Sequence, residues 1–195
     1  MKKLIGILAI LTIIFIYGCS KQPSSIKAKQ DGKPLIVMYG DFKCPYCKKV
    51  EDKVMPKLRN KYIDKNKVKF QYVNLAFIGK DSIIGSRAQQ AVNHYAPKYS
   101  LQFQKLMFEH QKDEDKKWIT HTLIDKQIDK LNISNKTKDK IKANYKTKNS
   151  TSWKAAEKDK KLGKEHHIKQ TPTVFIEGKK VKDPYDFSRD RKSVV

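Results

Sequence analysis

The chain has 195 residues, which suits one domain with room for an insertion and a core that needs no cross-links. Its 43 Lys and Arg outnumber 20 Asp and Glu, so the formal net charge is +23. The lysines are spread along the whole chain without an aromatic platform or a nucleic-acid motif, so we expect no nucleic-acid partner. The charge suits a protein held near an anionic membrane or cell wall.

The first residues have the pattern of an export signal. A basic MKK precedes the apolar residues 4–17, a run too short to span a bilayer but suited to a signal peptide. The run ends in IYGCS, which resembles a bacterial lipobox, where the cysteine receives a lipid. We therefore predict a signal peptide over residues 1–18, a lipid on Cys19, a tether over 19–33 and a place on the outer face of the cell membrane. An uncleaved anchor and an ordinary signal with a free Cys19 are the alternatives.

Strand and helix patterns alternate in the next part of the chain. Residues 34–40, PLIVMYG, form a continuous apolar run between Pro and Gly, which predicts a central strand. Apolar residues then recur at helical spacing in CPYCKKVEDKVMPKLRNKYI. Pro45 falls in the first turn of this helix, where proline is tolerated, whereas Pro56 lies inside and should kink it. The alternation in VKFQYVNLA, residues 68–76, predicts a second strand.

From about residue 80 to 165 the pattern is helical throughout, and no repeat is visible. Ser134 is a suitable N-cap for the fourth of five predicted helices. Strand character returns in TPTVFIEGKKV, residues 171–181, with a turn at Glu177-Gly178-Lys179 between two short strands. The residues that mark the predicted helices are Ile84, Ala88, Val92 and Tyr95; Phe103, Leu106, Met107 and His110; Ile119, Leu123, Ile128 and Leu131; Ile141 and Tyr145; and Trp153 and Ala156.

The three cysteines reduce to one pair once Cys19 is assigned to a lipid. Cys44 and Cys47 could form a structural disulfide, half of a zinc site or a redox pair. A disulfide that closes so short a loop removes little entropy from the unfolded chain. A zinc site needs two further ligands, and the adjacent His166 and His167 point to different sides of a helix, so we expect no metal. A CxxC at a strand-to-helix corner is typical of a thioredoxin-like redox motif.

The chemistry of such a pair follows from its place on a helix. We expect Cys44 at the exposed helix N-terminus, where free N–H groups and the positive helix end stabilise its thiolate. Cys47 should lie one turn in and be shielded. Lys43, Lys48 and Lys49 should add positive potential. A stabilised thiolate is a good leaving group, so the disulfide form should be easily reduced by a substrate.

The complete pattern resembles the DsbA thiol-disulfide oxidoreductase lipoproteins of Gram-positive bacteria. The lipobox, YGDFKCPYCKKVEDKVMPKL, the helical stretch and KQTPTVFIEGKKVKDPY carry the resemblance, which covers residues 33–185. It implies an α/β protein, a thioredoxin fold with an inserted all-helical domain. The fold would comprise residues 34–79 and 166–195, with the insertion over 80–165. Family members usually finish with an amphipathic helix, but the tail DFSRDRKSVV has no helical periodicity, so we expect that this helix is missing or that the tail is altered.

The same resemblance implies an extracytoplasmic thiol:disulfide oxidoreductase. We expect a monomeric dithiol oxidase that introduces disulfides into exported proteins with free thiols. The redox disulfide of Cys44 and Cys47 would serve without another cofactor. A reductase or isomerase of the same fold is one alternative, because a CPYC sequence does not fix the direction of electron flow. A non-catalytic basic surface lipoprotein that binds anionic polymers is another.

A substrate-binding loop is also implied. A cis-proline loop that faces the cysteines in this family maps onto Thr171-Pro172, and Thr171 would offer its backbone to the substrate chain. Asp41, Phe42 and Tyr46 are expected to shape the rim of the site, although simple packing accounts equally well for the two aromatic residues.

Overall fold

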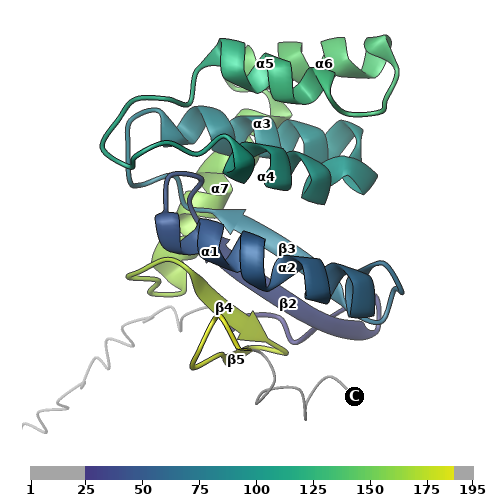
Figure 1. The fold of residues 1–195 in the computed structure, drawn as a ribbon, viewed down its shortest axis with the longest axis vertical. Coiled ribbons are helices and arrows are strands. Elements are labelled where there is room, and N and C mark those ends of the chain that lie inside the picture. Colours follow the sequence, from purple (N-terminus) through teal and green to yellow (C-terminus); the bar gives the residue numbers. More distant parts are fainter. Residues whose placement is uncertain (1–24, 187–195) are drawn as a thin grey trace, which may run out of the picture.

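The fold comes from a computed structural model, which describes residues 25–186. The predicted signal peptide, Cys19 and the tail after Asp186 lie outside the described residues. Figure 1 shows a central sheet with one helical layer in front of it and a stack of helices above it. No helix within residues 25–186 is both long and apolar enough to cross a membrane.

The sheet is built around one buried strand, β2. This strand pairs in parallel with β3 on one side and antiparallel with β4 on the other, and β5 pairs antiparallel with β4. A parallel neighbour requires a crossover, and α1 supplies it. The strands are β1 (Lys29–Gln30), β2 (Lys33–Gly40), β3 (Lys69–Asn74), β4 (Thr173–Ile176) and β5 (Lys179–Lys180).

Part of the predicted tether is ordered, which corrects that expectation. β1 turns back onto the first residues of β2 through Asp31 and Gly32, whose φ angles are 50° and 74°. Glycine adopts such an angle without steric cost. Ile26 also packs against buried side chains of the sheet. The packing of Ile26 and the tight turn at Asp31-Gly32 therefore order this segment, although its sequence is polar and has no periodicity.

The two faces of β2 serve two separate cores. Ile36 and Met38 belong to the larger cluster, which also holds the buried residues of α1 and of the helices above the sheet. Leu35, Val37 and Tyr39 face a smaller cluster on the opposite side. Both faces are covered, which explains why the strand is a continuous apolar run and not an alternating one.

The first long helical stretch is interrupted near Pro56, as predicted. α1 (Pro45–Lys53) ends before Val54, and α2 (Met55–Leu58) begins directly after it. Proline cannot donate the backbone hydrogen bond that a continuous helix needs at this point. A π-helical turn, Arg59–Ile63, completes the stretch.

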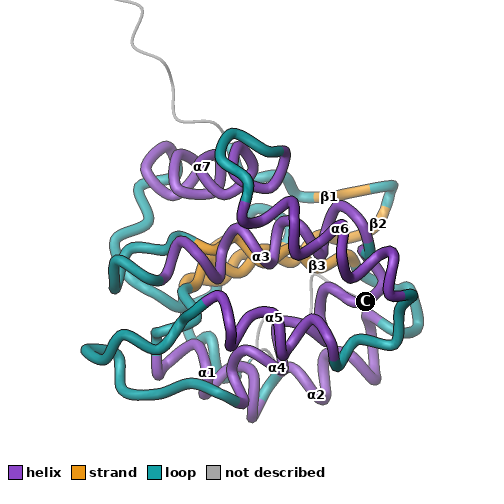
Figure 2. Tube along the Cα trace, turned by 90° about the horizontal axis from the view of Figure 1, so that it is seen from above, coloured by secondary structure: helices purple, strands orange, loops and turns teal. Residues whose placement is uncertain are grey.

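A block of helices lies between β3 and β4, in agreement with the predicted helical insertion. Figure 2 shows α7 on one side of the strands and α1 and α2 on the other. A side chain at Gly163 in α7 would meet Leu75 at 2.4 Å, so this helix approaches the sheet closely. The helices are α3 (Ser82–Tyr95), α4 (Ser100–Glu109), α5 (His121–Asp129), α6 (Asn135–Lys146) and α7 (Thr151–Glu165), with a 3-10 turn at Pro97–Tyr99.

Side-chain caps set the starts of α5, α6 and α7, the last through Ser150. Ser134 caps α6 as predicted. The hydroxyl of Thr120 caps α5 by accepting from the backbone N–H of Leu123 at 3.1 Å. Ile119 and Leu131 were predicted inside this helix, but they lie just beyond its two ends. Both are buried, because the apolar pattern marks burial and the cap marks the boundary.

Candidate redox site

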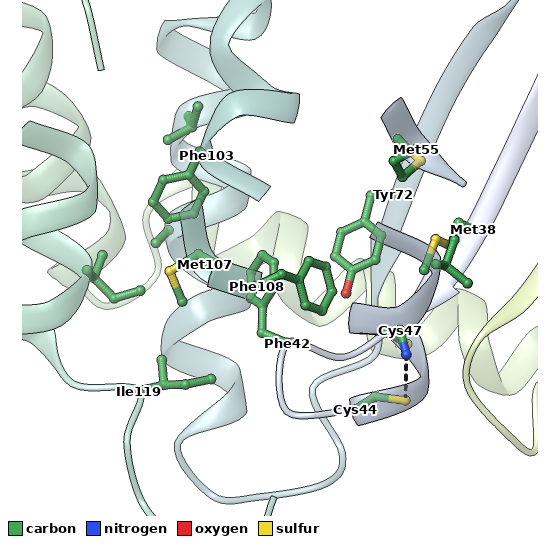
Figure 3. Packing of buried hydrophobic residues seen from close by; sticks show 14 of the residues in the cluster. Met38, Phe42, Cys44, Cys47, Met55, Tyr72, Phe103, Met107, Phe108 and Ile119 are labelled. Carbon is green, nitrogen blue, oxygen red and sulfur yellow. Dashed lines mark hydrogen bonds between the residues drawn. The ribbon is translucent and has the colours of Figure 1, made fainter. Parts of the chain in front are cut away.

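The two cysteines lie at the N-terminus of α1. Cys44 is the N-cap residue, and its Sγ accepts a hydrogen bond from the backbone N–H of Cys47 at 3.3 Å (Figure 3). Pro45 occupies the first turn, where its missing N–H is no loss. Both cysteines are free thiols in this structure. The strand-to-helix corner thus places one sulfur at the helix end and the other one turn inside.

Cys44 is more enclosed than the sequence predicts. Its exposed fraction is 3 %, so the expectation of an exposed sulfur is wrong. The loop before β4 lies against it, and the Cys44 Sγ donates to the backbone O of Thr171 at 3.4 Å. The peptide bond between Thr171 and Pro172 is cis, as the family resemblance implies. The substrate-binding residues expected in this loop therefore sit directly beside the first cysteine.

The two thiols have opposite acidities. The hydrogen bond with the side chain of Cys47 lowers the pKa of Cys44 most, whereas burial opposes it. The side chain of Thr171 and backbone hydrogen bonds with Cys47 and Tyr46 lower the pKa further, to about 7. Burial raises the pKa of Cys47 well above its ordinary value. Near neutral pH, the first sulfur is thus a thiolate in a large fraction of the molecules, whereas the second keeps its proton.

Lys43 does not add free positive charge beside the thiolate, contrary to expectation. Its Nζ forms an ion pair with the carboxylate of Asp81 at 3.0 Å, and both side chains are only 3 % exposed. The second oxygen of Asp81 accepts from the backbone N–H groups of Trp118 and Ile119 at 3.0 and 2.9 Å. The pair therefore ties the CPYC turn to the loop before α5.

The other two lysines near the site are also engaged. Lys48 pairs with Asp52 on the surface of α1 at 2.7 Å. The Nζ of Lys49 lies 4.2 Å from the centre of the Tyr185 ring. Hydrogen bonds to the sulfur, rather than free lysine charges, account for the low pKa of Cys44.

Asp41 and Phe42 do not shape a rim, because both are fully buried. One carboxylate oxygen of Asp41 accepts from the backbone N–H of Lys43 at 2.9 Å and from the Ser82 hydroxyl at 3.0 Å. The other accepts from the backbone N–H of Phe77 at 2.9 Å. This carboxylate fixes the turn that precedes Cys44.

Tyr46 is exposed beside the cysteines, as its expected place at the rim requires. It is 63 % exposed, and Phe77 is 55 % exposed. An open groove of about 850 Å³ is lined by Pro45 and by the loop 111–118. Exposed aromatic rings and a groove beside a reactive sulfur are features that suit the binding of a polypeptide.

Gln111, which no sequence pattern had marked, supports the site from the loop after α4. Its side-chain amide donates to the backbone O of Phe42 at 2.6 Å and of Cys44 at 3.1 Å. A contact across 67 residues follows no local period, so only the fold could reveal it.

Within the described part of the chain, the structure gives the two adjacent histidines no role as partners of the cysteines in a metal site. His166 Nδ1 shares a hydrogen bond with the hydroxyl of Tyr39, which faces the smaller core on the other side of the sheet. Among residues 25–186, no three His, Cys, Asp or Glu side chains gather as metal ligands do.

Comparisons with known proteins agree with this geometry. A family model described as Thioredoxin matches residues 26–194. Disulfide bond formation protein D of Bacillus subtilis is 31% identical over 180 residues, which are 90% of this chain and 79% of the relative. A probable disulfide bond formation protein D of Bacillus cereus is 31% identical over 81% of this chain and 72% of its own.

Solved structures show the same fold. Oxidised BdbD from Bacillus subtilis superposes with a TM-score of 0.73 at 30% identity, over 89% of this chain and 94% of that one. DsbA of Chlamydia trachomatis has a TM-score of 0.68 at 16% identity, over 88% and 92% of the two chains, and bears on the fold alone. The predicted thioredoxin fold with inserted helices is thus confirmed. The chain belongs to the DsbA-type branch of the thioredoxin family, and it is a thiol-disulfide oxidoreductase.

Proposed function

We propose that this enzyme is a dithiol oxidase that introduces disulfides into exported proteins. The observation that carries this proposal is the low pKa of Cys44, about 7, next to a Cys47 whose pKa burial raises. A thiolate that the protein stabilises favours the reduced form of the pair. The disulfide form is then a strong acceptor of electrons.

The reaction would proceed in two exchanges. A substrate thiolate attacks the Sγ of Cys44, the bond between Cys44 and Cys47 breaks, and Cys47 takes the electron pair and then a proton. A second thiolate of the substrate attacks the substrate sulfur of this mixed disulfide and releases Cys44 as a thiolate. The substrate loses two electrons and the cysteine pair gains them, so no further cofactor is needed.

An unfolded chain is the substrate that the surroundings of Cys44 suit best. The Thr171 backbone beside the sulfur is placed to pair with an extended substrate segment. The exposed rings of Tyr46 and Phe77 offer apolar contacts of the kind that an unfolded protein seeks. The names of the Bacillus relatives refer to disulfide bond formation, which agrees with such a substrate.

The proposal includes a location and a domain plan. We propose that residues 1–18 are a signal peptide and that a lipid on Cys19 holds a monomeric enzyme at the outer face of the cell membrane. Residues 34–79 and 166–195 would form the thioredoxin unit, and residues 80–165 its insertion. The pattern MKKLIGILAILTIIFIYGCS supports the first point.

Cys19→Ala tests the anchor. We expect the variant either in the medium or as an uncleaved precursor, because no lipid can be attached. Mass spectrometry of the mature N-terminus of the unsubstituted protein gives the control. An unmodified Cys19 in mature protein would contradict the anchor without touching the redox proposal.

Oxidative refolding tests the direction of the reaction. Catalytic amounts of the oxidised enzyme should speed disulfide formation in a reduced, unfolded substrate, and Cys44→Ser should not. Faster reduction of insulin than oxidation of the substrate would instead indicate a reductase, and preferential repair of scrambled disulfides an isomerase. A parent protein that speeds refolding no more than Cys44→Ser does would favour the non-catalytic surface lipoprotein.

A further inference from the structure

A buried hydroxyl without a partner lies behind the redox pair. Tyr72, on β3, is 6 % exposed, and within residues 25–186 its hydroxyl has no hydrogen-bond partner. Its ring is fixed by Phe42 and Phe108, whose ring centres are 5.6 and 6.2 Å away. A phenylalanine would fill the same space without burying an unpaired polar group, which destabilises a fold. The hydroxyl therefore calls for an explanation beyond packing.

The position of this hydroxyl connects it to Cys47. A side-chain carbon at Gly40 would lie 2.7 Å from the Tyr72 hydroxyl, so the hydroxyl lies against the end of β2. The next residue, Asp41, hydrogen-bonds through its backbone with Cys47. The hydroxyl and the sulfur thus flank the same peptide link, and Figure 3 shows the Tyr72 hydroxyl pointing toward the start of α1, where Cys47 lies.

The electrostatics agree with this placement. Burial raises the pKa of Tyr72 most, and the charge of Cys47 is the next largest cause. The phenol therefore stays protonated and can act as a donor but not as a base. Among the charged groups that raise the pKa of Tyr72, the second sulfur of the redox pair has the largest effect.

Thiol attack creates a charge at this place. When a thiolate attacks Cys44, the leaving sulfur of Cys47 becomes negative inside the protein, where its exposed fraction is 0 %. Hydrogen bonds with the Asp41 backbone and the Thr171 side chain stabilise this charge, but burial outweighs them. The Asp41 carboxylate cannot help, because it is an acceptor already held by the backbone of Lys43 and by Ser82.

We propose that the hydroxyl of Tyr72 donates a hydrogen bond to the sulfur of Cys47 as that sulfur leaves Cys44. The new disulfide joins the substrate to Cys44, and the electron pair of the broken bond goes to Cys47. Tyr72 holds the resulting thiolate until solvent supplies a proton. The inference deepens the proposed function and rests on it, since it concerns thiol attack on the oxidised pair.

Tyr72→Phe tests the donor because it removes only the hydroxyl. We expect reduction of the oxidised enzyme by glutathione to slow about tenfold, the usual size of one charge-assisted hydrogen bond. In a Cys19→Ser, Cys44→Ser background, thiolate absorbance should show the pKa of Cys47 raised by about one unit. The thermal stability should be equal or higher, because an unpaired polar group is gone.

Tyr39→Phe is the matched control on the neighbouring strand. This hydroxyl is hydrogen-bonded to His166 and faces the other side of the sheet. Its loss should lower stability and leave both the glutathione rate and the pKa of Cys47 unchanged. If Tyr72 is a donor to Cys47, Tyr72→Phe should be reduced slowly by glutathione and remain stable. Tyr39→Phe should be reduced at the parent rate and be less stable.

Two outcomes would overturn the proposal. If glutathione reduces Tyr72→Phe at the parent rate and the pKa of Cys47 is that of the parent, the hydroxyl makes no hydrogen bond to Cys47. A slow variant that is destabilised but keeps the parent Cys47 pKa shows a packing role only. A ring-fluorinated tyrosine at position 72, a stronger donor, should lower the Cys47 pKa, which keeps the test decisive if Tyr72→Phe folds poorly.

The proposed function can fail separately. The glutathione equilibrium of the parent enzyme reports the direction of the reaction, whereas the ratio of the Tyr72→Phe rate to the parent rate reports the donor. If the enzyme proves to be a reductant but the rate ratio is tenfold, the hydrogen bond from Tyr72 is supported and the oxidase function is contradicted. If the enzyme proves to be an oxidant but the rate ratio is one, the oxidase function is supported and the hydrogen bond from Tyr72 is contradicted.

Discussion

Cys44 and Cys47 lie one helical turn apart and differ almost entirely in their surroundings. Cys44 caps the helix and receives hydrogen bonds to its sulfur, so its pKa falls to about 7. Cys47 is enclosed by the apolar core, so burial raises its pKa well above the ordinary value. Residue type therefore sets neither role. The hydrogen bonds to each sulfur and its burial determine which thiol ionises and reacts with the substrate and which one stays protonated.

Exchange of either cysteine for serine should have the largest effect on activity, and the two variants should fail in different ways. Cys44→Ser should abolish exchange with substrates, because the remaining thiol of the pair, Cys47, has a raised pKa and keeps its proton near neutral pH. Cys47→Ser should keep a reactive thiolate and accumulate mixed disulfides that cannot be resolved internally. Intact mass spectrometry after mixing with a glutathione buffer distinguishes the two, and stable adducts on Cys47 in Cys44→Ser would contradict the assigned roles.

The turn that carries Cys44 should depend on the buried ion pair. Asp81→Asn leaves Lys43 charged and unpaired in the interior, and we expect the free energy of unfolding to fall by about 3–5 kcal/mol. Asp52→Asn breaks the surface pair with Lys48 and should cost about 0.5 kcal/mol or less. Urea unfolding measures both, and losses of similar size would show that the buried pair contributes no more than a surface pair.

The opposite pKa shifts predict an unusual pH dependence of stability in the reduced form. The pKa of Cys44 is lowered in the fold, so its contribution is present above the unfolded value of about 8.5 and is lost as the pH falls through about 7. The pKa of Cys47 is raised, so its contribution is lost as the pH rises above about 8.5.

The reduced form should therefore gain stability relative to the oxidised form between about pH 7 and about 8.5 and lose it at higher pH. The oxidised form has no titrating thiols at these positions and is the matched control. Thermal unfolding of both forms across this range measures the difference. A difference that does not change with pH would contradict the asymmetry between the two thiols.

Loss of the Gln111 amide should have a smaller effect than loss of the buried ion pair. Gln111→Ala removes the hydrogen bonds to the backbone O of Phe42 and of Cys44, so we expect a loss of about 1–2 kcal/mol in the free energy of unfolding. The pKa of Cys44 should change little, because the amide binds the backbone and not the sulfur. Alkylation of Cys44 as a function of pH measures this, and a shift of a full unit would make Gln111 part of the redox chemistry.

Local patterns sufficed to predict the elements that hold the site. The apolar run of β2, the CxxC at the start of α1 and the Ser134 cap each depend on neighbours in the sequence, and each lies where predicted. The turn between β4 and β5 is also found, at Glu177 and Gly178, whose φ angles are 48° and 77°. Lys179 begins the second strand, so the turn is shorter than predicted.

Periodicity did not predict the contacts between distant segments. The family resemblance placed the Thr171 loop opposite Cys44, 127 residues away, but it did not predict how fully this loop buries the sulfur. The pairing of Lys43 with Asp81, 38 residues away, was not predicted at all. Tyr72 fits the alternation of a strand whether or not its hydroxyl has a partner. Periodicity shows which face of an element is buried, but it does not show which polar atom on that face meets which partner.

The equilibrium of the Cys44–Cys47 pair with glutathione shows whether the enzyme is an oxidant. Because the fold stabilises the Cys44 thiolate, we expect the pair to be largely dithiol even in a buffer with an excess of oxidised glutathione. Alkylation of trapped thiols followed by mass spectrometry gives the ratio of the two forms. A pair that remains a disulfide in a large excess of reduced glutathione would show a reductant and would contradict the proposed oxidase.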